Sequence, residues 1–325
     1  MKQTFAALTA AAGMSLALIA GPSLAQTFPA QPIRIISPFP AGSGPDAVAR
    51  IVGDKLAASL KQPIVIDPRP GANGFLAANA VKAAAPTGYD LFLADIGHLT
   101  INPSLFKKLP YDPKADFVPV SGVYRASFFI AVGANSPIKN VKDLIAAAAV
   151  PGRVTYGSNS IGSPLHLGAA QIEAATNTKM VHVPYKEISQ LYAAVSTGEV
   201  DWALGSIASA GPLLRAGKLR FIAIADTARN ATLPDIPTFD QAGGPRPLSA
   251  NSWVSLVAPK GTPPAVVTTL NRAINDALKQ PDVVEKLAGF GFTPFLSTPA
   301  DLAKVIDTDT VSNAALVKRT GASVD

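Results

Sequence analysis

Apolar positions along this chain recur with two different periods. Short runs rich in Ile and Val are followed by longer stretches in which apolar residues recur every three to four positions. The short runs predict buried strands, and the longer stretches predict helices. Strands that alternate with helices favour an α/β fold in which helices cover a parallel sheet.

The N-terminal third shows this alternation most clearly. Strands are predicted at residues 33–36, 63–66 and 89–94. Helices are predicted at residues 45–60 and 75–85. The region from Gln31 to Tyr111 is therefore expected to form a parallel sheet with helices on it.

The alternation continues toward the C-terminus without a short internal repeat. Residues 118–124 are extended and predict a crossing into a second domain. Further strands are predicted at residues 128–132, 153–156, 179–183, 200–204, 219–224 and 253–258. Further helices are predicted at residues 141–150, from 164 onward, and at 188–197, 264–278, 281–287 and 299–317.

Two loops rich in glycine and serine follow predicted strands. They are residues 41–44 and 157–163, and each leads into a helix that begins with a proline. The first turn of a helix has unpaired backbone N–H groups at the positive end of the helix dipole, so both loops predict an anion site. In open α/β sheets, ligands bind beyond the carboxyl ends of the strands, where these loops lie. We therefore expect a small anion between the two loops.

Residues 1–25 predict a cleavable signal peptide. Lys2 supplies a positive charge, residues 5–20 are mostly apolar, and Ser23-Leu24-Ala25 offers small residues before a cleavage site ahead of Gln26. The apolar run is too short and too interrupted to span a bilayer, which takes about 20 apolar residues, so no membrane anchor is expected. The mature chain is expected in the periplasm of a bacterium.

Composition and charge exclude several classes of protein. The 325 residues are 48% hydrophobic and 15% charged, which excludes a disordered chain. The formal net charge of +6 is spread along the chain without Lys/Arg clusters, so nucleic acid is not an expected partner. The sequence has no cysteine, which excludes disulfides, thiol catalysis and Cys-ligated metals.

No motif predicts a serine hydrolase or a metal site, and the favoured function needs no cofactor. Residues 158–162 lack the first glycine of the Gly-x-Ser-x-Gly pattern of serine hydrolases. The three histidines are His98, His166 and His182, and none lies at metal-ligand spacing from another. His182 alternates within an apolar strand and is expected to be packed. His166 lies in the first helical turn after the second loop and is a candidate ligand contact.

The first loop also permits an alternative function. Residues 42–47 match the dinucleotide-binding pattern Gly-x-Gly-x-x-Gly/Ala, and Asp67 ends the next strand, where a ribose-binding acid is expected. An exported oxidoreductase is therefore an alternative. Export to a compartment without a ready nicotinamide pool argues against it, as do Pro38 and Pro40 before the glycines.

A series of short motifs occurs in order along the mature chain. They include Pro38-Phe39-Pro40-Ala41-Gly42, Arg69-Pro70-Gly71-Ala72, Ala85-Pro86-Thr87-Gly88-Tyr89, Leu109-Pro110-Tyr111-Asp112-Pro113, His182-Val183-Pro184-Tyr185-Lys186 and Leu233-Pro234-Asp235-Ile236-Pro237-Thr238. Through these motifs the chain resembles the tripartite tricarboxylate transporter receptor family, also called the Bug family of periplasmic solute-binding proteins.

The resemblance implies a fold and a role. The fold is a two-domain periplasmic-binding-protein fold of the Venus flytrap kind (type II), with domain 1 at residues 26–124 plus 227–325 and domain 2 at residues 125–226. The role is that of a monomeric, non-enzymatic receptor that binds a small carboxylate between its domains and delivers it to the permease subunits of a tripartite transporter. A ligand sensor that acts without a transporter is a second alternative.

The resemblance also implies which loops contact the ligand, largely through backbone groups and water. The expected contacts in domain 1 are Phe39, Ala41, Gly42, Ser43, Gly44, Asp46 and Asp95. The expected contacts in domain 2 are Ser158, Asn159, Ser163, His166, Tyr185 and Ser206.

Three positions depart from the family pattern and bear on specificity. Asp95 stands where a small neutral residue is usual, Glu187 replaces a glycine, and Gly205 replaces an aspartate. An ionised Asp95 in the cleft would repel a second carboxylate and favour an amine or hydroxyl. With Tyr185 and Trp202 expected near the variable end of the ligand, these changes favour a monocarboxylate or a zwitterion over a tricarboxylate.

Overall fold

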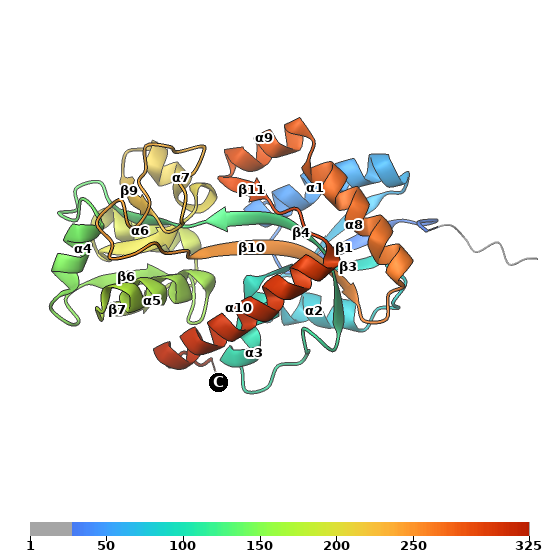
Figure 1. Cartoon of the computed structure of the whole chain (residues 1–325), viewed down its shortest axis with the longest axis horizontal. Coiled ribbons are helices and arrows are strands. Elements are labelled where there is room, and N and C mark those ends of the chain that lie inside the picture. The colour runs from blue at the N-terminus through green and yellow to red at the C-terminus, as the bar shows by residue number, and fades with distance from the viewer. Residues whose placement is uncertain (1–27, 325) are drawn as a thin grey trace, which may run out of the picture.

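Two separate sheets, each packed with helices, organise the chain (Figure 1). The computed structural model describes residues 28–324, so the predicted signal peptide and its cleavage site lie outside the described residues. The α/β prediction is confirmed. We refer to the two sheets with their helices as the first lobe and the second lobe.

The first sheet has six strands in the order β11-β4-β10-β3-β1-β2. Its strands are β1 (Ile33–Ser37), β2 (Ile64–Pro68), β3 (Asp90–Asp95), β4 (Phe117–Ser127), β10 (Asn251–Pro259) and β11 (Phe292–Pro294). The pairing of β1 with β2 and β3 is parallel, as predicted. Because β10 pairs antiparallel with both β3 and β4, the complete sheet is mixed.

Helices cover this sheet on both faces. They are α1 (Gly44–Leu60), α2 (Phe75–Lys82), α3 (Asn102–Leu105), α8 (Pro264–Leu278), α9 (Pro281–Gly289) and α10 (Pro299–Thr320), with the short turns η1 (Ala72–Gly74) and η2 (Gly97–Ile101). Neighbouring residues of β1 belong to different apolar clusters: Ile35 packs with α1 and Ile36 packs with α2. A strand buried on both faces reads as a continuous apolar run, which explains the pattern at this strand.

The second sheet has five strands in the order β7-β6-β8-β5-β9. Its strands are β5 (Phe129–Gly133), β6 (Thr155–Ser158), β7 (Val181–Pro184), β8 (Trp202–Gly205) and β9 (Leu219–Ile224). Its helices are α4 (Val141–Ala148), α5 (Pro164–Thr176), α6 (Ile188–Thr197) and α7 (Ile207–Arg215). β6 is parallel to β7 and β8, whereas β5 is antiparallel to β8 and β9.

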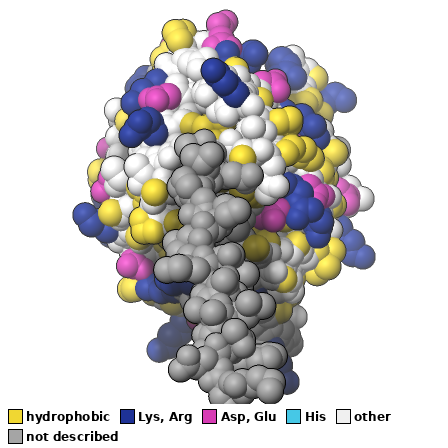
Figure 2. All heavy atoms as spheres, turned by 90° about the vertical axis from the view of Figure 1, so that its right-hand side faces the viewer, with side chains coloured by type: hydrophobic (Ala, Val, Ile, Leu, Met, Phe, Trp, Pro, Cys, Tyr) yellow, Lys and Arg dark blue, Asp and Glu magenta, His cyan; other side chains and the backbone are white. Residues whose placement is uncertain are grey.

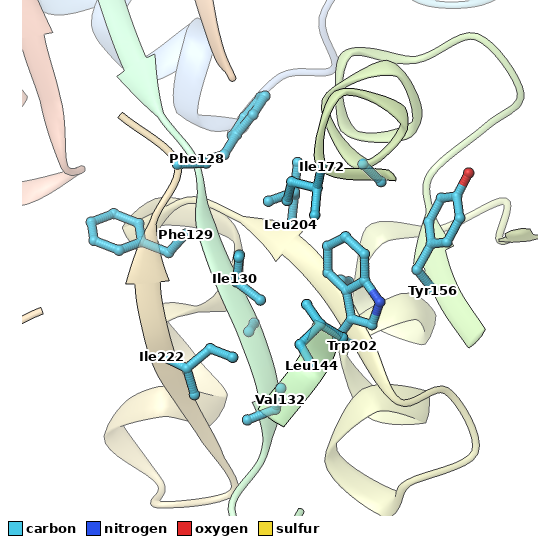
Figure 3. Packing of buried hydrophobic residues seen from close by; sticks show 14 of the residues in the cluster. Phe128, Phe129, Ile130, Val132, Leu144, Tyr156, Ile172, Trp202, Leu204 and Ile222 are labelled. Atoms are coloured by element: carbon cyan, nitrogen blue, oxygen red, sulfur yellow. The ribbon is translucent and has the colours of Figure 1, made fainter. Parts of the chain in front are cut away.

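Trp202 lies in the core of the second lobe, beside Leu144 and Tyr156 (Figure 3). Its side chain is 0% exposed, and its indole N–H is directed at the sulfur of Met180. The expectation that Trp202 lies near the ligand is therefore wrong, because this strand position faces the packed interior.

The lobes are joined by two strand connections and one helix. β4 runs into β5 through Phe128, and residues 225–250 lead from β9 back to β10. The stretch predicted as a crossing is thus part of β4 in the first sheet. The long helix α10 also packs against α5 of the second lobe (Figure 1). The predicted domain boundaries themselves stay a prediction.

The surface at the first-lobe end shows mixed charge. Figure 2 shows Lys and Arg side chains interspersed with Asp, Glu and apolar groups on this face. No helix within residues 28–324 combines the length and the apolar character needed to cross a membrane.

Candidate functional site

Each sheet has a switch point, where the connections that follow two neighbouring parallel strands lead to opposite sides of the sheet. β1 lies between β2 and β3, and β6 lies between β7 and β8. Loops that diverge from such a point leave a crevice beyond the carboxyl ends of the strands, where α/β proteins bind ligands. The predicted contact residues all lie at these strand ends or in the first helical turns that follow them.

A cavity of about 120 Å³ lies between the lobes at this level. The first lobe lines it with Asn73, Asp95, Gly97, His98, Asn102 and Leu105. The second lobe lines it with Asn159, Ser160, Ile161, Gly162, Ser163 and Pro164. The structure therefore brings together three predicted residues, namely Asp95, Asn159 and Ser163.

Two larger hollows, of about 690 and 560 Å³, lie along α10 where it faces α5. Their walls come mainly from α10, α5 and β7. The smaller cavity is the better candidate because it lies where strand-end loops of both lobes meet.

The β6–α5 loop presents the start of α5 to this cavity. Ser163 caps α5, because its Oγ accepts a hydrogen bond of 3.3 Å from the N–H of His166. The N–H of Gly162 donates to Nδ1 of His166 at 2.9 Å. The first turn of α5 contains no acidic residue, so the positive end of its dipole is uncompensated by the helix itself.

Ser158, His166 and His182 lie behind the loop and support it. Oγ of Ser158 donates to the carbonyl of Ser160 at 2.8 Å and lies 2.7 Å from Nε2 of His182. The rings of His166 and His182 stack with their centroids 3.9 Å apart. Burial lowers the pKa of each imidazole to about 4, and for His182 the neighbouring His166 adds to this. Both rings are therefore neutral at pH 7.

Asp95 ends β3 and forms a close pair with His98. Nδ1 of His98 lies 2.5 Å from Oδ1 of Asp95, and the His98 N–H donates to the same oxygen at 3.0 Å. Burial by itself would raise the pKa of Asp95, but His98 and the N–H groups of His98 and Gly97 outweigh it and hold that pKa below its usual value. Phe39 packs edge-on against the His98 ring, with centroids 5.8 Å apart.

The residues that line the cavity but were not predicted include three with polar side chains from the first lobe, namely Asn73, His98 and Asn102. Nδ2 of Asn102 donates to the hydroxyl of Tyr111 at 3.0 Å and to the carbonyl of Asn73 at 3.4 Å, and Tyr111 donates to the carbonyl of His98 at 2.7 Å. This network joins the η1 turn to η2, which is a π-helical turn of a kind often found at functional sites. The one sequence signal was the position of His98 three residues after Asp95.

The β1–α1 loop is arranged differently. The N–H of Gly42 donates to Oδ2 of Asp46 at 2.9 Å, and Asp46 also pairs with Arg50 at 3.0 Å. Burial would raise the pKa of Asp46, but Arg50 and the Gly42 N–H outweigh it and lower that pKa. Oγ of Ser43 donates to the carbonyl of Pro40 at 2.7 Å instead of capping α1. A carboxylate of the chain itself therefore lies at the start of α1.

The remaining predicted residues lie outside the lining of the cavity. Ala41 is exposed, and Gly44 lies close to Phe292 and to Ala208 at the start of α7. The Tyr185 hydroxyl donates to Glu199 at 3.2 Å, and Ser206 caps α7. Glu187 is exposed at the start of α6. Ligand contact by these residues stays a prediction.

Comparison with known proteins identifies the family. Residues 48–322 match the family described as the tripartite tricarboxylate transporter family receptor. The chain belongs to this family. The resemblance inferred from the sequence is therefore confirmed.

Similar proteins include one sequence relative and two solved structures with a bound carboxylate. Protein BugT of Bordetella pertussis is 34% identical over 308 residues, which cover 94% of each chain. The solved structure of Rhodopseudomonas palustris Rpa4515 with adipate is 29% identical, with a TM-score of 0.82 and coverage of 91% of this chain and 100% of that one. MatC from the same organism, with bound malate, is 29% identical, with a TM-score of 0.76 and coverage of 89% and 100%.

Proposed function

We propose that this receptor binds a small organic carboxylate between its two lobes and delivers it to the membrane permease of a tripartite transporter. The supporting observation is the cavity formed by the strand-end loops of both lobes, with the uncompensated start of α5 at its wall. A helix start of this kind favours a carboxylate. The adipate and malate bound to the two relatives are ligands of the same class.

The proposed location is the periplasm, reached by cleavage of the predicted signal peptide before Gln26. A receptor of this kind encounters its ligand outside the cytoplasm and closes its lobes around it. We propose a monomer that is not anchored in the membrane.

The proposal excludes catalysis, and two contacts argue against a dinucleotide-dependent oxidoreductase. Asp46 already bonds the Gly42 N–H, where a pyrophosphate oxygen would have to bind. Asp67, the acid that would hold a ribose, pairs with Arg69 at 2.9 Å. A sensor role without a transporter remains an alternative that growth on the ligand, before and after deletion of the candidate permease, distinguishes.

The test is a thermal-shift screen of the purified protein against mono-, di- and tricarboxylates and amino acids, followed by calorimetric titration. At least one carboxylate is expected to stabilise the folded protein, and the ligand recovered after incubation is expected to be unchanged. Chemical conversion that persists through repurification would show an enzyme instead. The absence of any carboxylate ligand would contradict the proposal.

Matched serine variants locate the binding site. Ser160→Asp places a negative charge in the cavity wall, and Ser43→Asp places one in the β1–α1 loop. We expect Ser160→Asp to abolish the response to the carboxylate and Ser43→Asp to preserve it. The opposite result would locate the ligand at the first loop.

A further inference from the structure

The residues that line the cavity include two side chains with oxygen acceptors, one from each lobe. Asp95 contributes a carboxylate, and Asn159 contributes a side-chain carbonyl. Oδ1 of Asn159 is buried and has no hydrogen-bond partner within the described part of the chain. A buried acceptor without a donor is unfavourable, so a ligand that supplies a donor there is stabilised.

Asp95 carries its negative charge into this space. Its side chain is 18% exposed, and its contacts with His98 hold the carboxylate in place at the end of β3. An ionised group in a partly dry site attracts a cation and repels a second anion.

The charges around the cavity favour one carboxylate on the ligand and not two. No Lys or Arg belongs to the described residues that line it. The start of α5 offers a place for one carboxylate, since its first turn has no acid. Among the described residues that line the cavity, the basic side chain beside Asp95 is His98, and it is already paired with Oδ1 of Asp95. A second carboxylate would therefore meet Asp95 without a lysine or arginine to offset the repulsion.

We infer that the ligand is a small zwitterion, with its carboxylate at the start of α5 and its ammonium group between Asp95 and Oδ1 of Asn159. This inference rests on the proposed function and narrows the ligand class. The cavity of about 120 Å³ suits a compact ligand of the amino-acid type.

The test compares ligands that differ in one group. The full chain is first screened by thermal shift against the standard amino acids and against carboxylates that include malate and adipate. For the carbon skeleton that binds best, calorimetry then compares the derivatives with an ammonium, a hydroxyl or a carboxylate on the same carbon, such as alanine, lactate and methylmalonate. The ammonium derivative is expected to bind most tightly.

Asp95→Asn tests the charge with little change in shape. It is expected to weaken binding of the ammonium derivative by about 10- to 100-fold, because a charge-assisted hydrogen bond is lost, and to change binding of the hydroxyl derivative little. The matched control is Asp90→Asn at the other end of β3, where Asp90 pairs with Arg34 away from the cavity. This control is expected to leave the ligand preference unchanged.

The outcomes distinguish failure of the zwitterion inference from failure of the proposed function. Tighter binding of malate, adipate or another dicarboxylate than of every ammonium-bearing acid overturns this inference and leaves the proposed function standing. Binding of no carboxylate at all overturns both. If Asp95→Asn does not fold, Asn159→Ala is measured in its place, and it is expected to weaken binding of the ammonium derivative about 2- to 10-fold. An unchanged preference in that variant contradicts the inference.

Discussion

The loop after β1 and the loop after β6 share a backbone arrangement but differ in charge. In each loop a glycine with a left-handed backbone, φ +79° at Gly42 and φ +74° at Gly162, donates its N–H to the side chain four residues later. In the first loop that acceptor is the carboxylate of Asp46. In the second loop it is the neutral imidazole of His166.

We expect this difference to decide which loop attracts an anion. Asp46 neutralises the start of α1, whereas His166 occupies the Gly162 N–H without adding a negative charge to α5. The second loop also lines the cavity and the first does not. A glycine–serine loop before a helix thus predicts the local backbone geometry. We expect the residue four positions after the glycine to determine whether the start of the helix can bind an anion.

The largest expected difference between the two loops is in the effect of replacing their glycines, Gly42 and Gly162, by alanine. Both substitutions strain a left-handed backbone, and each is expected to lower the free energy of unfolding by roughly 1–2 kcal/mol. A Cβ at Gly162 would lie only 2.4 Å from Cδ1 of Leu105 in the other lobe, whereas one at Gly42 would meet nothing within 4 Å. Gly162→Ala alone is therefore expected to oppose closure of the lobes.

The expected loss of ligand affinity in Gly162→Ala is about 5- to 150-fold, from an overpacking cost of about 1–3 kcal/mol. Gly42→Ala is expected to bind as the wild type does. Thermal unfolding measures the shared strain, and calorimetry measures the affinity. Equal affinities in the two variants would show that the contact with Leu105 does not form in the bound state.

Replacement of His166 by aspartate gives the second loop the same negative charge that Asp46 gives the first. In His166→Asp the new carboxylate can accept the Gly162 N–H, as Asp46 does for Gly42, and it places a negative charge at the start of α5. We expect it to bind the carboxylate ligand about 10-fold more weakly than His166→Asn, which offers a neutral acceptor. Calorimetry at pH 7 compares the two, and circular dichroism checks that both fold. The same affinity in both variants would contradict an anion site at this helix.

The smallest expected difference between the loops is in the free energy of unfolding after the hydroxyl of Ser43 or Ser163 is removed. Ser163→Ala removes a helix cap and is expected to lower the free energy of unfolding by about 1 kcal/mol. Ser43→Ala removes only an exposed hydrogen bond to Pro40 and is expected to cost roughly 0.5 kcal/mol or less. Urea unfolding, with the slope compared among the variants, measures both. A larger loss for Ser43→Ala would show that the cap at α5 contributes little.

Much of the secondary structure followed from local pattern. Helices α6 (Ile188–Thr197) and α8 (Pro264–Leu278) have the bounds predicted from apolar periodicity. Helix α7 (Ile207–Arg215) was missed because it contains Gly211 and Pro212, which ordinarily argue against a helix. It is stabilised at its start by a capping box of Ser206 and Ser209.

Local sequence was enough to predict most of the strands, most of the helices, and the two loops that start α1 and α5, because these depend on residues within a few positions of one another. The short strand β11 was missed, and β4 was expected to be a crossing between domains. The position of β10 between β3 and β4 depends on contacts between distant parts of the chain. In the pairing of β10 with β3, Ser255 lies opposite Ala94, which is 161 positions away in the chain. The backbone hydrogen bonds of a strand are the same for nearly every residue type, so they do not specify which strand becomes the neighbour. The same long-range folding buried Trp202, brought Asn73 and Asn102 to Asp95, and set that group against Asn159 of the other lobe.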